Sequence, residues 1–174
     1  MTRCVVASLL IFTLAAGICG AAELASHADL ARIFRTEKFR LIYHVRQISE
    51  QDWTAAGVRP DGRSITASMV DPGHSYSSED YMIGDPQRQL LLAAKSKQHE
   101  LLSYWQATHG GPILRVLMLE HAGRKRKLIF YAVMNNDIAP ECWTWGELKG
   151  HIVQNKMDHL ISAEHPGTFD NRLP

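Results

Sequence analysis

The sequence predicts an α+β domain, in which helices near both ends pack on an antiparallel sheet of about five or six strands. Two observations lead to this class. Three segments carry the polar cap residues that begin α-helices, each close to apolar residues that a helix would bury. Between them lie runs of branched, aromatic and aliphatic residues separated by turn residues, which is typical of strands joined by short connections.

The first two elements follow the start of the domain. In ASHADLARIF, Ser26 stands as an N-cap with Asp29 three residues on, which predicts a helix. Its apolar residues recur at helical spacing: Leu30, Ile33 and Phe34. The segment KFRLIYHVRQ alternates instead, which predicts a strand with one apolar face. That face would hold Phe39, Leu41, Tyr43 and Val45, opposite Arg40, His44 and Arg46.

A second helix is predicted in ISEQDWTAAG. Ser49 is the cap, Asp52 takes the third helical position, and Gly57 can end the helix. Ile48 and Trp53 fall at the two positions of a hydrophobic staple. The following segment SITASMV, residues 64–70, predicts a short strand, and residues 71–87 read as a long loop.

Residues 87–109 allow two interpretations. Asp85–Pro86 before this segment and Gly110–Gly111–Pro112 after it would bracket one long helix. However, positions 95–100 contain no apolar residue, which interrupts the helical stripe and suits the turn of a hairpin at Lys97–Gln98. The hairpin of RQLLLAAKS and HELLSYWQAT is the interpretation we favour.

The last elements are a strand pair and a helix. PILRVLMLEH and KLIFYAVM are rich in branched and aromatic residues, and AGRKR between them reads as a turn. Their nearly continuous apolar character predicts central strands covered by other elements. A final helix is predicted over about 144–156, followed by a polar tail over residues 161–174.

The N-terminus is a separate segment. The run Cys4–Ala22 contains no charged residue and has small residues at Gly20 and Ala22. This pattern predicts a signal peptide over residues 1–22, cleaved before Glu23. The alternative is an uncleaved anchor, because 19 apolar residues can just span a bilayer. In both cases the domain would lie outside the cytosol.

Cleavage of the signal peptide would determine the net charge and the cysteine content of the single mature domain, residues 23–160. Cleavage leaves 18 basic and 18 acidic residues and one cysteine, Cys142. A neutral domain has no strong field to attract nucleic acid, and one cysteine forms no intrachain disulfide. We therefore expect no nucleic-acid partner, no membrane span after cleavage, and a fold stabilised by its core. If a macromolecule binds, we expect another protein of the cell envelope.

The segment PECWTWGEL raises the question of whether Cys142 is a reactive thiol. Thr144 followed by Glu147 has the pattern of a capping box, and Trp143 with Leu148 has that of a staple, so the segment predicts a helix start. A helix N-terminus can lower a thiol pKa, but a cysteine hydrolase also needs a histidine within hydrogen-bond reach. Cys142 is thus a candidate nucleophile, with a half-buried apolar cysteine as the alternative.

One segment suggests a binding surface. SYWQATHGG combines Tyr104, Trp105 and His109 beside two glycines, and an exposed aromatic side chain next to such a turn suits recognition. The alternative is that Trp105 fills the core.

The chain contains no sequence motif for a metal or cofactor site. Its nine histidines show no HxH or HExxH spacing, so any metal site would have to be assembled by the fold, and we expect no metal and no cofactor. Acidic residues for catalysis are also unassigned: Glu79, Asp80, Asp85, Glu100 and Glu120.

The run from RQLLLAAKS through YWQATHGG, VLMLE and KLIFYAV to TWGELKGHIVQNKMD resembles small exported bacterial proteins with no assigned activity. This resemblance covers about 70 residues and brings no catalytic residues. The sequence therefore suggests an exported binding or inhibitor-like domain. A small hydrolase, using Cys142 or an assembled histidine–carboxylate site, is the alternative.

Overall fold

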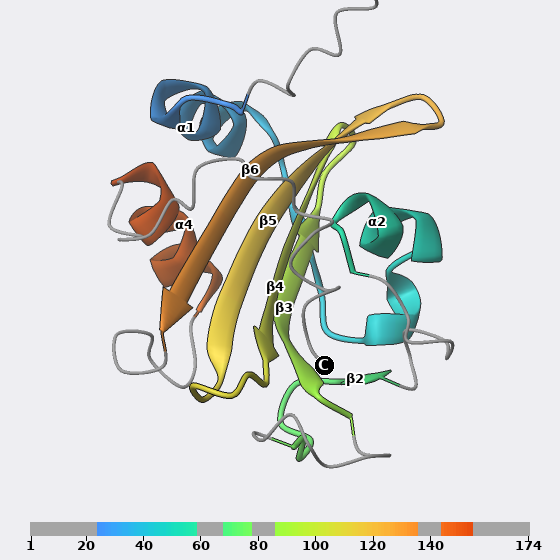
Figure 1. Ribbon diagram of the computed structural model, residues 1–174. Coiled ribbons are helices and arrows are strands. Elements are labelled where there is room, and N and C mark those ends of the chain that lie inside the picture. Colours follow the sequence, from blue (N-terminus) through green and yellow to red (C-terminus); the bar gives the residue numbers. More distant parts are fainter. Residues whose placement is uncertain (1–23, 59–67, 78–85, 136–143, 155–174) are drawn as a thin grey trace, which may run out of the picture.

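The protein is built around an antiparallel sheet with helices on both faces, as a computed structural model shows (Figure 1). The structure describes residues 24–58, 68–77, 86–135 and 144–154. The strand order is β1-β3-β4-β5-β6, and a short β2 pairs with β3 in parallel. The predicted α+β class, with five or six strands, is confirmed.

Two long hairpins form the centre of the sheet. β3 (Arg88–Lys95) and β4 (His99–Gln106) pair antiparallel, so the hairpin interpretation of residues 87–109 is confirmed. The polar positions 95–100 contain its turn, in which the Ser96 hydroxyl accepts a hydrogen bond from the His99 amide (2.8 Å). β5 (Ile113–Ala122) and β6 (Lys125–Asn135) form the second hairpin. Its tight turn requires Gly123, whose φ of 62° few side chains adopt.

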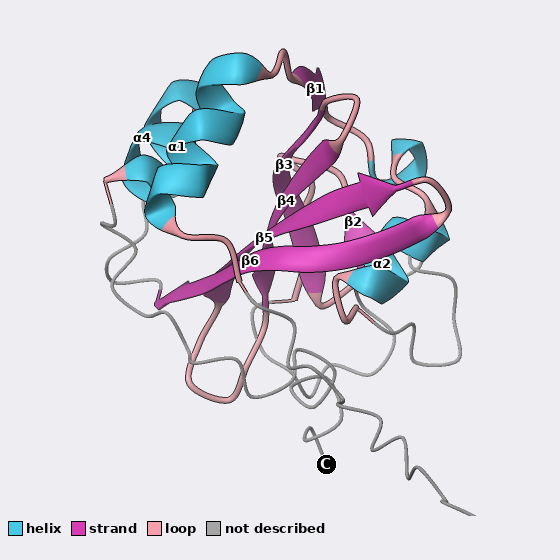
Figure 2. Cartoon of the chain, turned by 90° about the horizontal axis from the view of Figure 1, so that it is seen from above, coloured by secondary structure: helices cyan, strands magenta, loops and turns pink. Residues whose placement is uncertain are grey.

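The two faces of the sheet bury separate cores. Helices α1 (His27–Thr36) and α4 (Trp145–Val153) lie side by side on one face, whereas α2 (Glu50–Ala55) lies on the other (Figure 2). Since side chains alternate along a strand, each central strand supplies both cores. In β4, for example, Leu101 belongs to the first core and Leu102 to the second.

The three predicted helix caps are present. Ser26 and Thr144 each form a capping box with the acid three residues on, Asp29 and Glu147 respectively. Ser49 accepts a hydrogen bond from the Asp52 amide at the start of α2. The caps confirm three helix starts that were identified from sequence spacing alone.

The alternation predicted for the first strand is wrong. β1 (Arg40–Ile42) has only three residues, and Tyr43 is 55% exposed although the pattern placed it on the apolar face. The chain leaves the sheet after Ile42 and forms the 3₁₀ turn η1 (Val45–Gln47). Val45 and Ile48, three residues apart at the two ends of this turn, are both buried, because a 3₁₀ helix has three residues per turn. β2 (Met69–Val70) is the described end of the predicted 64–70 strand.

Several predictions fall on residues outside the described ranges. These are the signal peptide, Cys142, Trp143 and the polar tail. Within the ranges that are described, no helix is long and apolar enough to span a membrane.

Candidate functional site

Polar side chains gather on both faces of the sheet at the end where the two hairpins turn. Adjacent residues of β4, β5 and β6 point to opposite faces, so each neighbouring pair is divided between them. The cross-strand register aligns His99 with Glu120 and Glu120 with Lys127. The side facing α1 therefore holds His99, Glu120 and Lys127, and the side facing α2 holds Glu100, His121 and Arg126.

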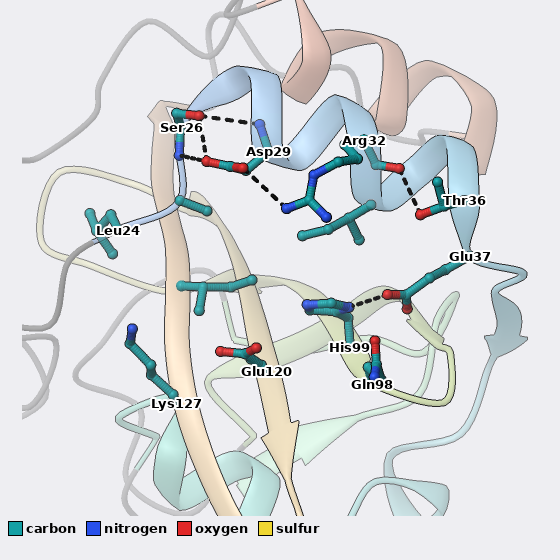
Figure 3. A pocket seen from close by; sticks show the side chains of 13 residues that line it. Leu24, Ser26, Asp29, Arg32, Thr36, Glu37, Gln98, His99, Glu120 and Lys127 are labelled. Carbon is teal, nitrogen blue, oxygen red and sulfur yellow. Dashed lines mark hydrogen bonds and ion pairs between the residues drawn. The ribbon is translucent and has the colours of Figure 1, made fainter.

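A groove lies between α1 and this end of the sheet (Figure 3). Its volume is about 720 Å³, within the usual range of small-molecule sites. Both α1 and the strands contribute polar side chains to it: Ser26, Asp29, Arg32, Thr36, Glu37, Gln98, His99, Glu120 and Lys127. Apolar contacts come from residues such as Ile33 and Ile129, which also belong to the first core.

One histidine in the groove is held in a fixed orientation. His99 Nδ1 donates to a Glu37 carboxylate oxygen at 2.7 Å, and the Ser96 hydroxyl donates to the other oxygen of Glu37. The His99 side chain is only 9% exposed. Because Nδ1 is engaged by Glu37, the second ring nitrogen is directed away from that carboxylate and into the groove (Figure 3). A neutral imidazole held this way can accept a hydrogen bond or a proton from a bound molecule.

The groove also carries charges of both signs. On α1, Arg32 forms an ion pair with Asp29 (3.1 Å). Hydrogen bonds from Ser26 and Arg32 lower the pKa of the Asp29 carboxyl, so it is ionised at neutral pH. On the strands, Glu120 is half-buried and Lys127 is exposed. The groove can therefore pair with a cationic and an anionic group at the same time.

The opposite face holds a buried charged cluster, which we call the α2 cluster: Asp52, Lys95, Glu100, His121 and Arg126. The carboxyl groups of Asp52 and Glu100 are 1% and 0% exposed. Lys95 Nζ lies 2.5 Å from Glu100 Oε2 and 3.3 Å from Asp52 Oδ2. Arg126 Nε donates to Asp52 Oδ1 at 2.6 Å.

Burial and neighbouring charges shift the pKa values of the two carboxyl groups in this cluster in opposite directions. Burial opposes ionisation of Asp52, but hydrogen bonds from Ser49, Arg126 and Lys95 outweigh it and hold the pKa of Asp52 well below its usual range. Burial raises the pKa of Glu100 to about 7, and the negative Asp52 adds to this rise, whereas Lys95 opposes it. For His121, burial and then the positive Arg126 and Lys95 lower the pKa. Asp52 is therefore a fixed anion, whereas Glu100 changes its charge near neutral pH.

The three residues proposed as a binding surface are not brought together. Trp105 is 4% exposed and packs in the core beneath α1 and α4. Tyr104 is 2% exposed on the opposite face, where its ring meets Trp53 edge to face at 5.8 Å between centroids. Of the three, only His109 is exposed. The strand alternation divides the aromatic pair between the two cores, so it forms no common exposed surface.

The sequence carries a signal for these polar groups in two pairs of adjacent titratable residues. His99–Glu100 and Glu120–His121 are adjacent pairs of titratable residues in strands that are otherwise mostly apolar. Alternation sends one member of each pair to each face, and antiparallel pairing places the two turn-proximal ends together. The sequence marks Asp52 only as the third residue of a helix that Ser49 caps, and its place in the α2 cluster depends on where α2 packs.

Comparison of the chain with protein-family models, curated proteins and solved structures finds no match.

Proposed function

We propose that this protein is an exported binding domain, and that the groove between α1 and the strand turns binds a small zwitterionic ligand such as an amino acid or a short peptide. The observation that carries the proposal is the groove itself, with one fixed histidine and charges of both signs. Export rests on the N-terminal sequence pattern.

The fixed histidine supports recognition because it needs no reordering when a ligand binds. Glu37 and Ser96 hold His99 before binding, which reduces the conformational entropy lost on association. The ligand's ammonium group would pair with Glu120, and its carboxylate with Lys127. Gln98 and the second ring nitrogen of His99 would supply further hydrogen bonds.

The hydroxyl nearest to His99 is not arranged as a nucleophile. A serine nucleophile donates its proton to the histidine that activates it. Here the Ser96 hydroxyl donates to Glu37, while its oxygen accepts hydrogen bonds from the amides of Gln98 and His99. This arrangement favours a binding function for the groove over acyl transfer from Ser96.

The second candidate is a hydrolase in which His99 acts as a general base on a bound substrate. The Glu37–His99 pair favours it, since a carboxylate at Nδ1 fixes the tautomer that leaves the other nitrogen able to accept a proton. The variant His99→Gln separates the two functions. A binding domain would show no turnover with wild type or variant, and the variant would bind more weakly. A hydrolase would show turnover in wild type, and the variant would keep binding and lose that turnover. A loss of turnover on alkylating Cys142, without unfolding, would instead favour chemistry at that thiol.

Calorimetric titration of the purified protein with amino acids and dipeptides tests the proposed function. We expect Lys127→Glu to weaken binding roughly tenfold, which corresponds to about 1.4 kcal/mol. Glu120→Lys should do the same, and the double exchange should recover part of the loss because both charges are then present again. Arg124→Glu is the matched control, because Arg124 is an exposed cation at the hairpin turn and does not line the groove. Equal losses in the control, or no saturable binding of any zwitterion, would contradict the proposal.

A further inference from the structure

The α2 cluster brings together three side chains of the types that bind transition metals. Asp52 comes from α2, Glu100 from β4 and His121 from β5. One ligand atom from each lies within 4.8 Å of the other two. His121 Nε2 is 3.3 Å from Glu100 Oε2 and 3.5 Å from Asp52 Oδ1.

Two buried atoms of the cluster have no hydrogen-bond partner among the described residues. The first is His121 Nε2, although two carboxylate oxygens lie near it. The second is Glu100 Oε1. The side chains are 10% and 0% exposed, so water does not readily serve these atoms. Buried polar atoms normally find partners, and a bound ion is one way in which such atoms are satisfied.

Two of the spacings between these atoms match those of a tetrahedral centre. Zinc bonds histidine nitrogen and carboxylate oxygen at about 2.0–2.2 Å, which places neighbouring tetrahedral ligands about 3.3–3.6 Å apart. The two distances from His121 Nε2, 3.3 and 3.5 Å, fall in this range. Two oxygens and one imidazole nitrogen also form a donor set that zinc and its divalent neighbours accept.

We propose that Asp52, Glu100 and His121 form a binding site for Zn²⁺ or a similar divalent transition-metal ion, and that the Lys95 ammonium competes with the metal for this site. The inference is independent of the groove, which lies on the other face of the sheet. It assigns the α2 cluster a ligand that the sequence alone did not predict.

The residues around Asp52 suit the role of orienting a metal ligand. The Ser49 hydroxyl donates to Asp52 Oδ2 at 2.6 Å, and Arg126 Nε donates to Oδ1 at 2.6 Å. Carboxylate ligands of metals are commonly held by such outer hydrogen bonds. Each Asp52 oxygen retains lone pairs after these bonds, because a carboxylate oxygen accepts more than one contact.

Lys95 determines how tightly the metal can bind. Its ammonium contacts both Glu100 Oε2 and Asp52 Oδ2, so the protein already places a cation between the two carboxylates. The Lys95 side chain is 31% exposed and lies at the end of β3, so its long stem can carry the ammonium into solvent when a metal enters. Metal affinity should therefore increase when this competing charge is removed.

The test is a calorimetric titration of the purified protein with Zn²⁺, repeated with Co²⁺ to observe the visible absorption of a tetrahedral centre. We expect one equivalent to bind with this spectrum. His121→Ala should weaken that binding by about 100-fold or more. The loss of a residue that only orients a metal ligand can weaken binding by as little as ~10-fold. Glu100→Gln, which preserves shape, should also weaken binding strongly. Lys95→Met should tighten it, by roughly tenfold.

The control variant is His109→Ala, which removes an exposed histidine and should leave the titration unchanged. Circular dichroism of each variant shows whether it is folded, and the shape-preserving Glu100→Gln keeps the test valid if His121→Ala unfolds. The proposal is overturned if the wild type binds no stoichiometric metal, or if its Co²⁺ spectrum survives Glu100→Gln. It is also overturned if Lys95→Met binds metal more weakly, because the α2 cluster would then be a structural ion network only.

Discussion

Adjacent strand residues in this protein point to opposite faces of one sheet. His99 lines the groove and Glu100 enters the α2 cluster, and the same division separates Glu120 from His121. The cause is strand geometry, because successive side chains alternate in direction. A substitution at one member of a pair should therefore affect one site and leave the other nearly unchanged.

Substitution of Thr144 measures how much one cap hydrogen bond contributes to the free energy of unfolding. Its hydroxyl accepts from the Glu147 amide, and Glu147 Oε2 accepts from the Thr144 amide at 2.8 Å. Thr144→Ala removes the cap oxygen and should lower the free energy of unfolding by about 1 kcal/mol. Thr144→Ser keeps the oxygen and should lose much less. Urea denaturation of both variants measures the difference, and equal stability of Thr144→Ala and wild type would show that the cap is not needed.

Asp71 should make stability depend on pH in the acidic range. Burial opposes ionisation of Asp71, but hydrogen bonds from His44 (2.9 Å) and the Val45 amide (2.7 Å) outweigh it and lower the pKa of the carboxyl below 3.8. The ionised form is thus favoured by folding. Its contribution is present above the unfolded-state pKa and is lost as the pH falls through the lower folded-state value.

Comparison of wild type with Asp71→Asn isolates this effect. The variant should be less stable than wild type at pH 6, and the gap should shrink as the pH falls below about 4. Urea denaturation at a series of pH values gives the two curves. Parallel curves would mean that Asp71 has the same pKa in the folded and unfolded chain. His44→Gln removes one of the two contacts and should change the slope less than Asp71→Asn does.

The helix α2 is too short to be stable alone and depends on what it contacts. Six residues make less than two turns, so Ser49, the Arg126–Asp52 contact and the burial of Trp53 must hold it on the sheet. Trp53 is 1% exposed and meets Tyr104 edge to face. The same contacts carry Asp52 into the α2 cluster, so packing at this element determines the position of the proposed metal ligand.

A pair of aromatic substitutions tests this dependence. Trp53→Ala should lower the free energy of unfolding by about 3–5 kcal/mol, as expected for a buried tryptophan. Tyr43→Ala is the matched control, since Tyr43 is 55% exposed, and should change stability by no more than about 0.5 kcal/mol. Chemical denaturation of both variants gives the comparison. A large loss at Tyr43 would indicate that the predicted long strand forms after all.

Elements with strong local signals were predictable from the sequence. The three caps depend on residues within one turn of each other, and the two hairpins on apolar runs interrupted by polar turns. The end of β1 was not predictable, because Tyr43 continues the alternation and only the packing of η1 interrupts it. The candidate sites depend on contacts between distant segments, such as Glu37 with His99, and no short-range pattern encodes these.

At the scale of the whole molecule, one end of the sheet contributes polar residues to both of its helix-covered faces. Helix α1 lies on one face of the sheet and α2 on the other (Figure 1). The strand ends near the turns place titratable residues beside each helix. A buried sheet covered by helices on both sides leaves each face as a separate environment, with a separate core. The proposed groove ligand and the proposed metal ion would therefore contact different residues.

Export is testable on the intact chain. The uncharged run that ends at Ala22 predicts cleavage there. Mass spectrometry of the protein recovered from the cell envelope should show a start within a residue or two of Glu23. Recovery of the exported protein with Met1 intact would favour the uncleaved anchor.

The most direct test of the central claim, that the groove is the binding site, is to map a bound zwitterion by NMR. Amide resonances of the ¹⁵N-labelled protein would be followed during titration with the tightest-binding amino acid or dipeptide. We predict saturable shifts at Gln98, His99, Glu120 and Lys127, with Arg124 unchanged. Shifts that avoid the groove, or that concentrate on the exposed segment around His109, would contradict the account.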